Sequence, residues 1–166
     1  NVTLSSDDLL EHGRYVFYAA GCISCHTRDQ QMAGGRPVDT PFGTFYPPNA
    51  KPQKEHGIGD WSEEDFVRAL REGLSPQGEH YYPAFPYPSY TRMTQQDMQA
   101  LYAYLLTLPE SSRAIRPHNL DWPFSVRPMM SYWKARRFSP GEFVADPEKS
   151  TQWNRGAYLA DALGHC

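Results

Sequence analysis

The pentapeptide from Cys22 to His26, CISCH, constrains this chain more than any other stretch. Residues three apart on one helical turn share a face, so the two thiols can react with neighbouring groups on one edge of a single ligand. The histidine that follows projects from the same turn. This spacing is the attachment pattern of c-type haem. We therefore expect one haem c held by thioethers to Cys22 and Cys25, with His26 as an axial iron ligand.

Two other chemistries use a Cys-x-x-Cys pair, and the rest of the sequence favours neither. A redox disulfide of this spacing accompanies a βαβ pattern, which the chain does not show. A zinc site needs a second pair of cysteines or histidines at suitable spacing. The remaining histidines are instead scattered singly: His12, His56, His80, His118 and His165.

The second axial ligand has several candidates. Methionine is the usual partner of histidine in electron-transfer haem c, and Met93 ends a proline-rich segment directly before a helix cap at Thr94. A ligand presented there can face the haem from the side opposite His26. Met32 lies too close in sequence to His26 to do so. Core packing is expected for three others, Met98, Met129 and Met130. The runner-up ligand is His80, although a solvated loop position is the expectation for it.

Periodicity and capping residues predict an all-α chain with long loops. Helices are expected at 6–20, 62–73, 94–108, 128–138 and 152–163. CISCH is expected at the end of the first of them. The segments 27–59 and 75–92 are rich in proline and glycine, so they are predicted to be loops without helix or central strand.

Composition excludes two classes of partner. The formal net charge is −3 and the pI is near 6.1, so no basic excess is present for nucleic acid or an anionic membrane. No apolar run approaches the roughly 20 residues that a membrane span requires. We expect a periplasmic protein, because bacteria attach haem c outside the cytoplasm.

An internal repeat links the two ends of the sequence. Gly13-x-Tyr15-Val16 precedes Gly21-Cys22, and Gly156-x-Tyr158-Leu159 precedes Gly164-x-Cys166. We predict that Cys166 is the first cysteine of a second haem motif in a longer protein. The alternative is a free or intermolecularly paired thiol. The predicted organisation is a haem domain at 1–109, followed at 110–166 by a connector and the first helix of a second domain.

Several longer stretches resemble one known family. They are Ala20–His26, Gly34-Gly35, Thr40–Tyr46, Asn49, His56–Gly59, Tyr82–Tyr87, Met98–Leu105 and Trp153–Cys166. The chain resembles the multi-haem cytochrome c subunits of bacterial membrane-bound dehydrogenases that oxidise alcohols, gluconate, sorbitol and related compounds. The resemblance implies a class I cytochrome c-like fold. Many members have Met-Pro where this chain has Phe85-Pro86, so the methionine ligand must come from elsewhere, and Met93 is nearby.

The resemblance also implies a function. Such subunits are not themselves the catalytic subunit. They accept electrons from a dehydrogenase subunit and pass them to membrane quinone or to a downstream cytochrome or oxidase. The alternative is a haem enzyme or sensor with an open or labile sixth iron site, which would need a distal acid, base or thiolate.

Overall fold

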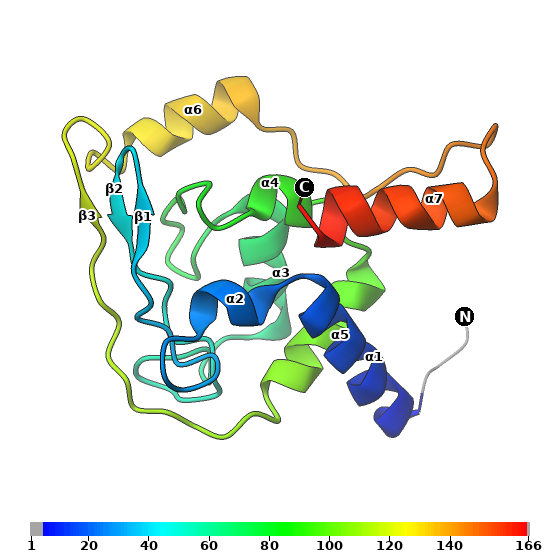
Figure 1. Cartoon of the computed structure of the whole chain (residues 1–166), viewed down its shortest axis with the longest axis horizontal. Coiled ribbons are helices and arrows are strands. Elements are labelled where there is room, and N and C mark those ends of the chain that lie inside the picture. Colours follow the sequence, from blue (N-terminus) through cyan, green and yellow to red (C-terminus); the bar gives the residue numbers. More distant parts are fainter. Residues whose placement is uncertain (1–4, 166) are drawn as a thin grey trace.

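Helices dominate the computed structural model, which describes residues 5–165, and a small sheet lies at one end (Figure 1). This arrangement confirms the predicted class and is consistent with a class I cytochrome c-like fold. The helices are α1 (Ser6–Ala19), α2 (Cys22–His26), α3 (Glu63–Glu72), α4 (Tyr87–Tyr90), α5 (Gln95–Leu105), α6 (Met129–Arg137) and α7 (Thr151–Tyr158), which continues into a π-helical turn, η1 (Leu159–Leu163).

Short-range side-chain chemistry explains where four of these helices begin. Each is preceded by a serine or threonine whose hydroxyl accepts a hydrogen bond from the backbone N–H three residues later. These N-caps are Ser5, Ser62, Thr94 and Ser150. At the other end of α3, Gly73 adopts a left-handed φ of 64°. The Tyr87 ring would lie 2.7 Å from a Cβ there, so glycine is required on two grounds.

The hydrophobic core is built on the crossing of α1 and α5. A Cβ placed at Gly13 would lie 2.0 Å from the Ala100 carbonyl oxygen, so this glycine allows the two helix backbones to touch. Val16 and Phe17 on α1 are fully buried beside Met98 on α5. The predicted core position of Met98 is therefore confirmed.

A three-stranded antiparallel sheet was not predicted from the sequence. Its strands β1 (Val38–Thr40), β2 (Gly43–Phe45) and β3 (Asn119–Leu120) lie in that order. A Cβ at Gly43 would lie 2.4 Å from the Asn119 carbonyl oxygen, so the strands approach closely at this glycine. The strands are very short, and β3 comes from a remote segment, so no local alternation marks them.

The proline-rich segment 75–92 contains one helical turn, α4, contrary to prediction. Pro88 occupies its first turn, where a missing backbone N–H leaves no helical hydrogen bond unmade. The density of prolines therefore excluded a long helix but not a single turn.

Helix α6 forms where predicted, but it does not bury its methionines in the core. Met129 is 48% exposed, so its predicted packing role is wrong. The buried residue of α6 is Lys134, whose Nζ donates to the Glu72 and Gly73 carbonyls at the end of α3. A cation at this end complements the helix dipole, so α6 is anchored by a lysine rather than by apolar side chains.

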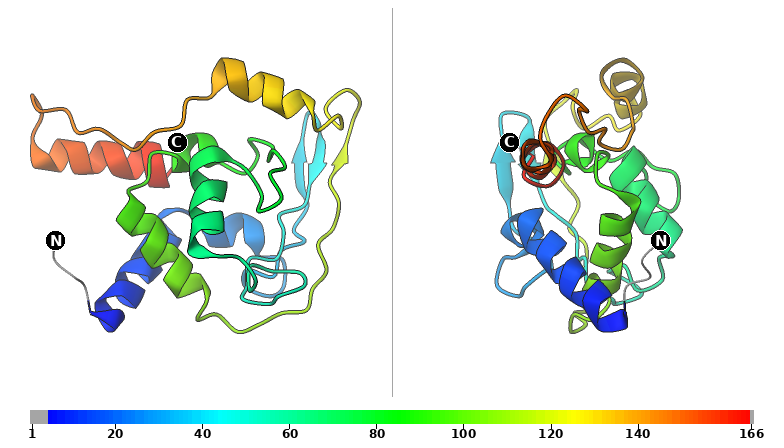
Figure 2. Two further views of the ribbon diagram at one scale, coloured as in Figure 1. Left: turned by 180° about the vertical axis from the view of Figure 1, so that it is seen from behind. Right: turned by 90° about the vertical axis from the view of Figure 1, so that its right-hand side faces the viewer.

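The C-terminal part of the chain returns to the core formed around α1 and α5. Figure 2 shows α7 projecting from the molecule while its far end comes back against α4. Tyr158, Ala162 and Leu163 are buried in the same cluster as Val16 and Phe17. Within residues 5–165, no helix is both long and apolar enough to cross a membrane.

Candidate haem-binding site

The CISCH segment forms a helix of its own, rather than the end of the first helix as predicted. Gly21, at φ 67°, turns the chain between α1 and α2 in a left-handed conformation that glycine adopts without strain. Cys22 is half-buried and Cys25 is exposed, and both thiols are free. One turn of helix thus presents both sulfurs and the His26 ring.

The environment of Cys22 disfavours thiolate chemistry. Burial raises the pKa of this thiol to about 12, and the neighbouring Cys25 contributes in the same direction. No group of three or more His, Cys, Asp or Glu side chains in the described part of the chain could hold a metal ion.

His26 is oriented by a backbone carbonyl. Its Nδ1 lies 2.8 Å from the Pro48 oxygen, and because a carbonyl can only accept, Nδ1 must carry the proton. This leaves Nε2 as the unprotonated nitrogen that can bind iron. Burial lowers the pKa of His26, while the bond to Pro48 raises it. The arrangement is that of a histidine ligand fixed by an outer partner.

The Pro48 carbonyl is itself braced by two glycines from a segment predicted to be a loop. The N–H of Gly34 donates to the His26 carbonyl at 2.8 Å, and that of Gly35 donates to Pro47 at 2.9 Å. A Cβ on Gly34 would lie 2.4 Å from the Pro48 carbonyl carbon. The Gly-Gly and Pro-Pro pairs thus pack directly together. The sequence did not predict that these residues support the axial histidine. The Gly34-Gly35 and Pro47-Pro48 dipeptides were the signal that could have indicated it.

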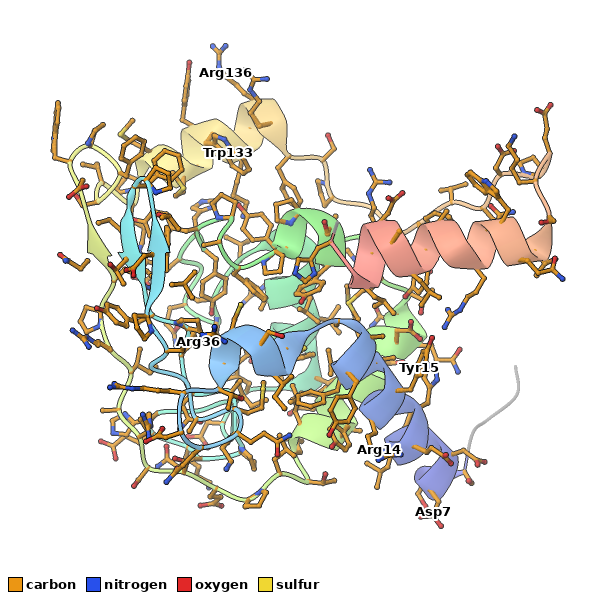
Figure 3. The ribbon with its side chains drawn as sticks, viewed as in Figure 1. Asp7, Arg14, Tyr15, Arg36, Trp133 and Arg136 are labelled. Atoms are coloured by element: carbon orange, nitrogen blue, oxygen red, sulfur yellow. The ribbon has the colours of Figure 1, made fainter. Side chains whose placement is uncertain are left out.

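Arg36 closes the same loop over α2. Its guanidinium donates to the Ser24 carbonyl, and Figure 3 shows its side chain beside α2. The CISCH turn is therefore held by the 34–36 loop from one side and by Pro48 from another.

Met93 lies in the core, between α4 and α5. It is 0% exposed and belongs to the hydrophobic cluster against which Cys22 and Ile23 pack. Its own N–H donates to the Tyr90 carbonyl at 2.9 Å. The Tyr90 hydroxyl in turn donates to the Ala20 carbonyl at 2.6 Å, just before the CISCH turn. The structure thus joins the Met93 segment and the attachment segment, which are about 70 residues apart in sequence.

His80 occupies a different environment from the one expected. The residue is half-buried, and its Nδ1 is buried and has no hydrogen-bond partner among the described atoms, so His80 is less solvated than expected. Burial lowers its pKa, and the charge of Lys134 adds to the effect. Its environment therefore includes the buried lysine of α6.

The predicted second motif falls at the edge of the described chain. Cys166 lies outside the described residues. The ring of His165, just before it, packs edge-on against Tyr90 at 5.6 Å between centroids. A Cβ at Gly21 would lie 3.8 Å from the same histidine ring. The residue before Cys166 is thus beside the residue before Cys22.

Several known proteins align with nearly the whole of this chain. A nicotinate dehydrogenase subunit from Pseudomonas putida is 49% identical over 160 residues, which are 95% of this chain and 14% of that protein. A diheme cytochrome c-type protein from Cereibacter sphaeroides is 42% identical over 93% of this chain and 54% of its own length. The gluconate 2-dehydrogenase cytochrome c subunit from Pantoea cypripedii is 38% identical over 98% of this chain and 38% of its own length.

The chain thus spans about half or less of the length of each of these relatives. Residues 10–109, which run from within α1 to four residues beyond α5, match the Cytochrome c family. That range contains the CISCH turn, the Pro48 carbonyl that orients its histidine, and Met93. By this match, and by relatives named as cytochrome c proteins, the chain belongs to the cytochrome c family.

Proposed function

We propose that this chain is an electron-transfer domain in which Cys22 and Cys25 hold haem c and His26 and Met93 bind its iron. The family match supports the cofactor. The relatives named as cytochrome subunits of fructose and gluconate dehydrogenases support the role. Haem c supplies a one-electron redox centre whose potential the axial ligands and their surroundings set.

One observation carries the proposal: the 2.8 Å contact between His26 Nδ1 and the Pro48 oxygen. A histidine ligand almost always donates its second ring N–H to a carbonyl or carboxylate, which fixes the ring and raises its basicity. Here the brace of glycines and prolines holds the carbonyl in place. The chain therefore orients its own axial ligand, and Met93, shielded from water, suits the opposite side.

The partners follow from the relatives. We propose that a dehydrogenase subunit supplies the electrons, because relatives at 37% to 42% identity are named as cytochrome subunits of alcohol, gluconate and fructose dehydrogenases. Membrane quinone or a downstream cytochrome or oxidase is the proposed acceptor. A periplasmic location is part of this proposal, since haem c is attached outside the bacterial cytoplasm.

The proposal extends to a longer protein. Cys166 is proposed as the first cysteine of a second haem motif, and the relative named as a diheme cytochrome supports this. The proposed boundary at 109 coincides with the end of the family match. Residues 110–166 are then a connector and the first helix of the next domain.

Mass spectrometry and optical spectra test the haem site. We expect the denatured protein to carry one covalent haem, and Cys22→Ala with Cys25→Ala to carry none. The oxidised protein should show the weak near-infrared band of sulfur ligation and should not bind carbon monoxide when reduced. Met93→Ala should lose the band and bind carbon monoxide.

Met98→Leu is the matched control, because Met98 is equally buried on α5 and is not a proposed ligand. It should keep the band. A sulfur band that persists in Met93→Ala would reject Met93 and favour Met98, whereas a wild-type protein without the band and without carbon monoxide binding would favour His80. Carbon monoxide binding by the wild-type protein would reject the six-coordinate electron carrier in favour of an open-site enzyme or sensor.

A further inference from the structure

The starts of α3 and α5 share a sequence pattern but differ in structure. Both have a Ser or Thr cap with aspartate three residues later. In α3 the pair is closed, because Asp65 Oδ2 accepts from the Ser62 N–H at 3.1 Å. In α5 the Thr94 N–H donates instead to the Tyr158 hydroxyl at 3.0 Å. A residue from α7 has taken the place that the local aspartate would occupy.

Asp97 is displaced into a buried network. One of its carboxylate oxygens accepts from the Tyr158 hydroxyl at 2.5 Å, and the other lies 2.6 Å from His12 Nε2 on α1. Asp97 and Tyr158 are each 5% exposed. Burying an unpaired polar group is costly, so the bonds of Asp97 to Tyr158 and His12 offset the free-energy cost of burying the carboxylate. The network joins α1, α5 and α7 at one point.

The segment that leads into α7 also binds the residue before Met93. The N–H of Phe143 donates to the Arg92 carbonyl at 2.9 Å. The Phe143 ring packs edge-on against the Tyr158 ring at 5.7 Å between centroids. The residues directly before and directly after Met93 are therefore both bonded to a segment that lies beyond the family-matched range of 10–109.

Helix α7 is also attached to α1 independently of this network. Arg155 donates to the Tyr15 hydroxyl at 3.1 Å, and its guanidinium lies over the Tyr158 ring at 5.4 Å. Figure 3 shows Tyr15 on the side of α1 that is nearest to α7. The position of the Tyr158 ring is thus also supported by Arg155, independently of the bond to Thr94.

We propose that Tyr158 is a positioning residue for Met93. By holding the Thr94 N–H and the Asp97 carboxylate, it fixes the loop that presents the methionine sulfur. This inference rests on the proposed function, in which Met93 binds the iron. It adds that methionine ligation depends on a helix outside the haem domain proper, so that the position of α7 controls how firmly the sulfur stays in place.

The consequence is measurable as competition for the iron. An added ligand such as imidazole binds only the fraction of molecules whose methionine has left, so its apparent affinity reports the population of that state. Tyr158→Phe keeps the ring but removes the hydroxyl, so the part-buried Thr94 N–H and a buried Asp97 carboxylate oxygen both lose their partner. We expect imidazole to bind the oxidised Tyr158→Phe protein roughly tenfold more tightly than wild type, with a weaker near-infrared band.

Ser62→Ala is the matched control, because it removes the equivalent cap of α3 without touching Thr94. It should leave imidazole affinity and the near-infrared band unchanged. His12→Gln is a second test that alters the outer member of the network, where the histidine side chain is 31% exposed. It should tighten imidazole binding by about threefold, and it decides the matter if Tyr158→Phe does not fold.

Imidazole affinities in Tyr158→Phe and His12→Gln that match Ser62→Ala would overturn the positioning role. A wild-type protein without the sulfur band would overturn it too, together with the assignment of Met93. Covalent haem and reversible reduction are measured separately on the same samples. A failure of this inference is therefore distinguishable from a failure of the electron-transfer proposal.

Discussion

In α1 the glycine of the Gly-x-Tyr repeat is buried and its tyrosine is exposed, whereas in α7 the arrangement is reversed. Gly13 lies at the α5 crossing, and Tyr15 is 46% exposed. In the second copy, no described atom outside the helix backbone lies within 4 Å of a Cβ built at Gly156, while Tyr158 is buried in the core that contains Val16 and Phe17. Similar sequences form similar helices, but the neighbours decide which face is covered.

The comparison also bears on the proposed second domain. In the first copy the glycine face receives α5, the helix that follows Met93. The open glycine face of α7 is the equivalent surface in the second copy. It would receive the corresponding helix of a second domain if the proposal for Cys166 holds.

The largest expected effect comes from the two glycines. Gly13→Ala should lower the free energy of unfolding by about 3 kcal/mol, because the methyl group would meet the Ala100 carbonyl at 2.0 Å and separate two helices. Gly156→Ala should raise it by about 0.5 kcal/mol through helix propensity alone. Urea unfolding of this chain measures both. Equal effects at the two sites would show that the copies are packed alike.

For the tyrosines, the second copy should show the larger loss of unfolding free energy. Tyr158→Phe is expected to lower the free energy of unfolding by about 2 kcal/mol, because the part-buried Thr94 N–H and a buried Asp97 oxygen lose their shared partner. Tyr15→Phe should change it by less than about 0.5 kcal/mol, as expected for an exposed side chain. Urea unfolding of the two variants measures both changes. A larger loss at Tyr15 would contradict the proposed network.

The helix starts should behave alike in both copies. The hydroxyl of Ser5 accepts from the Asp8 N–H, and that of Ser150 accepts from the Trp153 N–H. Ser5→Ala and Ser150→Ala should each lower the free energy of unfolding by about 1 kcal/mol, and serine-to-glycine changes by only a few tenths. Markedly unequal losses would mean that the two starts are not equivalent local caps.

The smallest expected effect is a pH dependence specific to the second copy. Burial, and then the bond to Asp97, raise the pKa of Tyr158 well above the ordinary value of 10.0. The unfolded chain therefore releases this proton first, so the stabilisation is complete below pH 10 and is lost as pH rises toward the folded pKa. At pH 10 the loss relative to pH 8 is about 0.4 kcal/mol. Wild type and Tyr158→Phe should therefore differ in how their unfolding free energies change between these two pH values, and identical curves would contradict the assignment.

Local chemistry explains what could be predicted. The cap at Thr94 and the helix at 62–73 were predicted correctly, because helix starts and stops depend on residues within one helical turn. The helical class followed from apolar periodicity. The haem motif and the resemblance led to the cytochrome c family, which the comparisons confirm. The ligand roles of Cys22, Cys25, His26 and Met93 remain proposals.

The errors have a common origin in distant contacts. The strand β3 pairs with β2 from more than 70 positions away, so no local pattern marks it. Met129 was placed in the core because it is apolar, but Lys134 on the same helix holds the buried position instead. His80 was assigned to solvent because it lies in a loop, yet its ring nitrogen is buried.

The sequence alone determined the local features of this protein, which include the spacing of CISCH, the helix caps and the apolar stripes. Each of these depends on atoms within four residues of one another. Only the tertiary structure decided that the Pro48 carbonyl orients His26 and that Tyr158 replaces Asp97 at the Thr94 N–H. Those contacts join residues 22 and 64 positions apart. A hydrogen bond between distant residues depends on how the helices pack, and no local pattern records that packing.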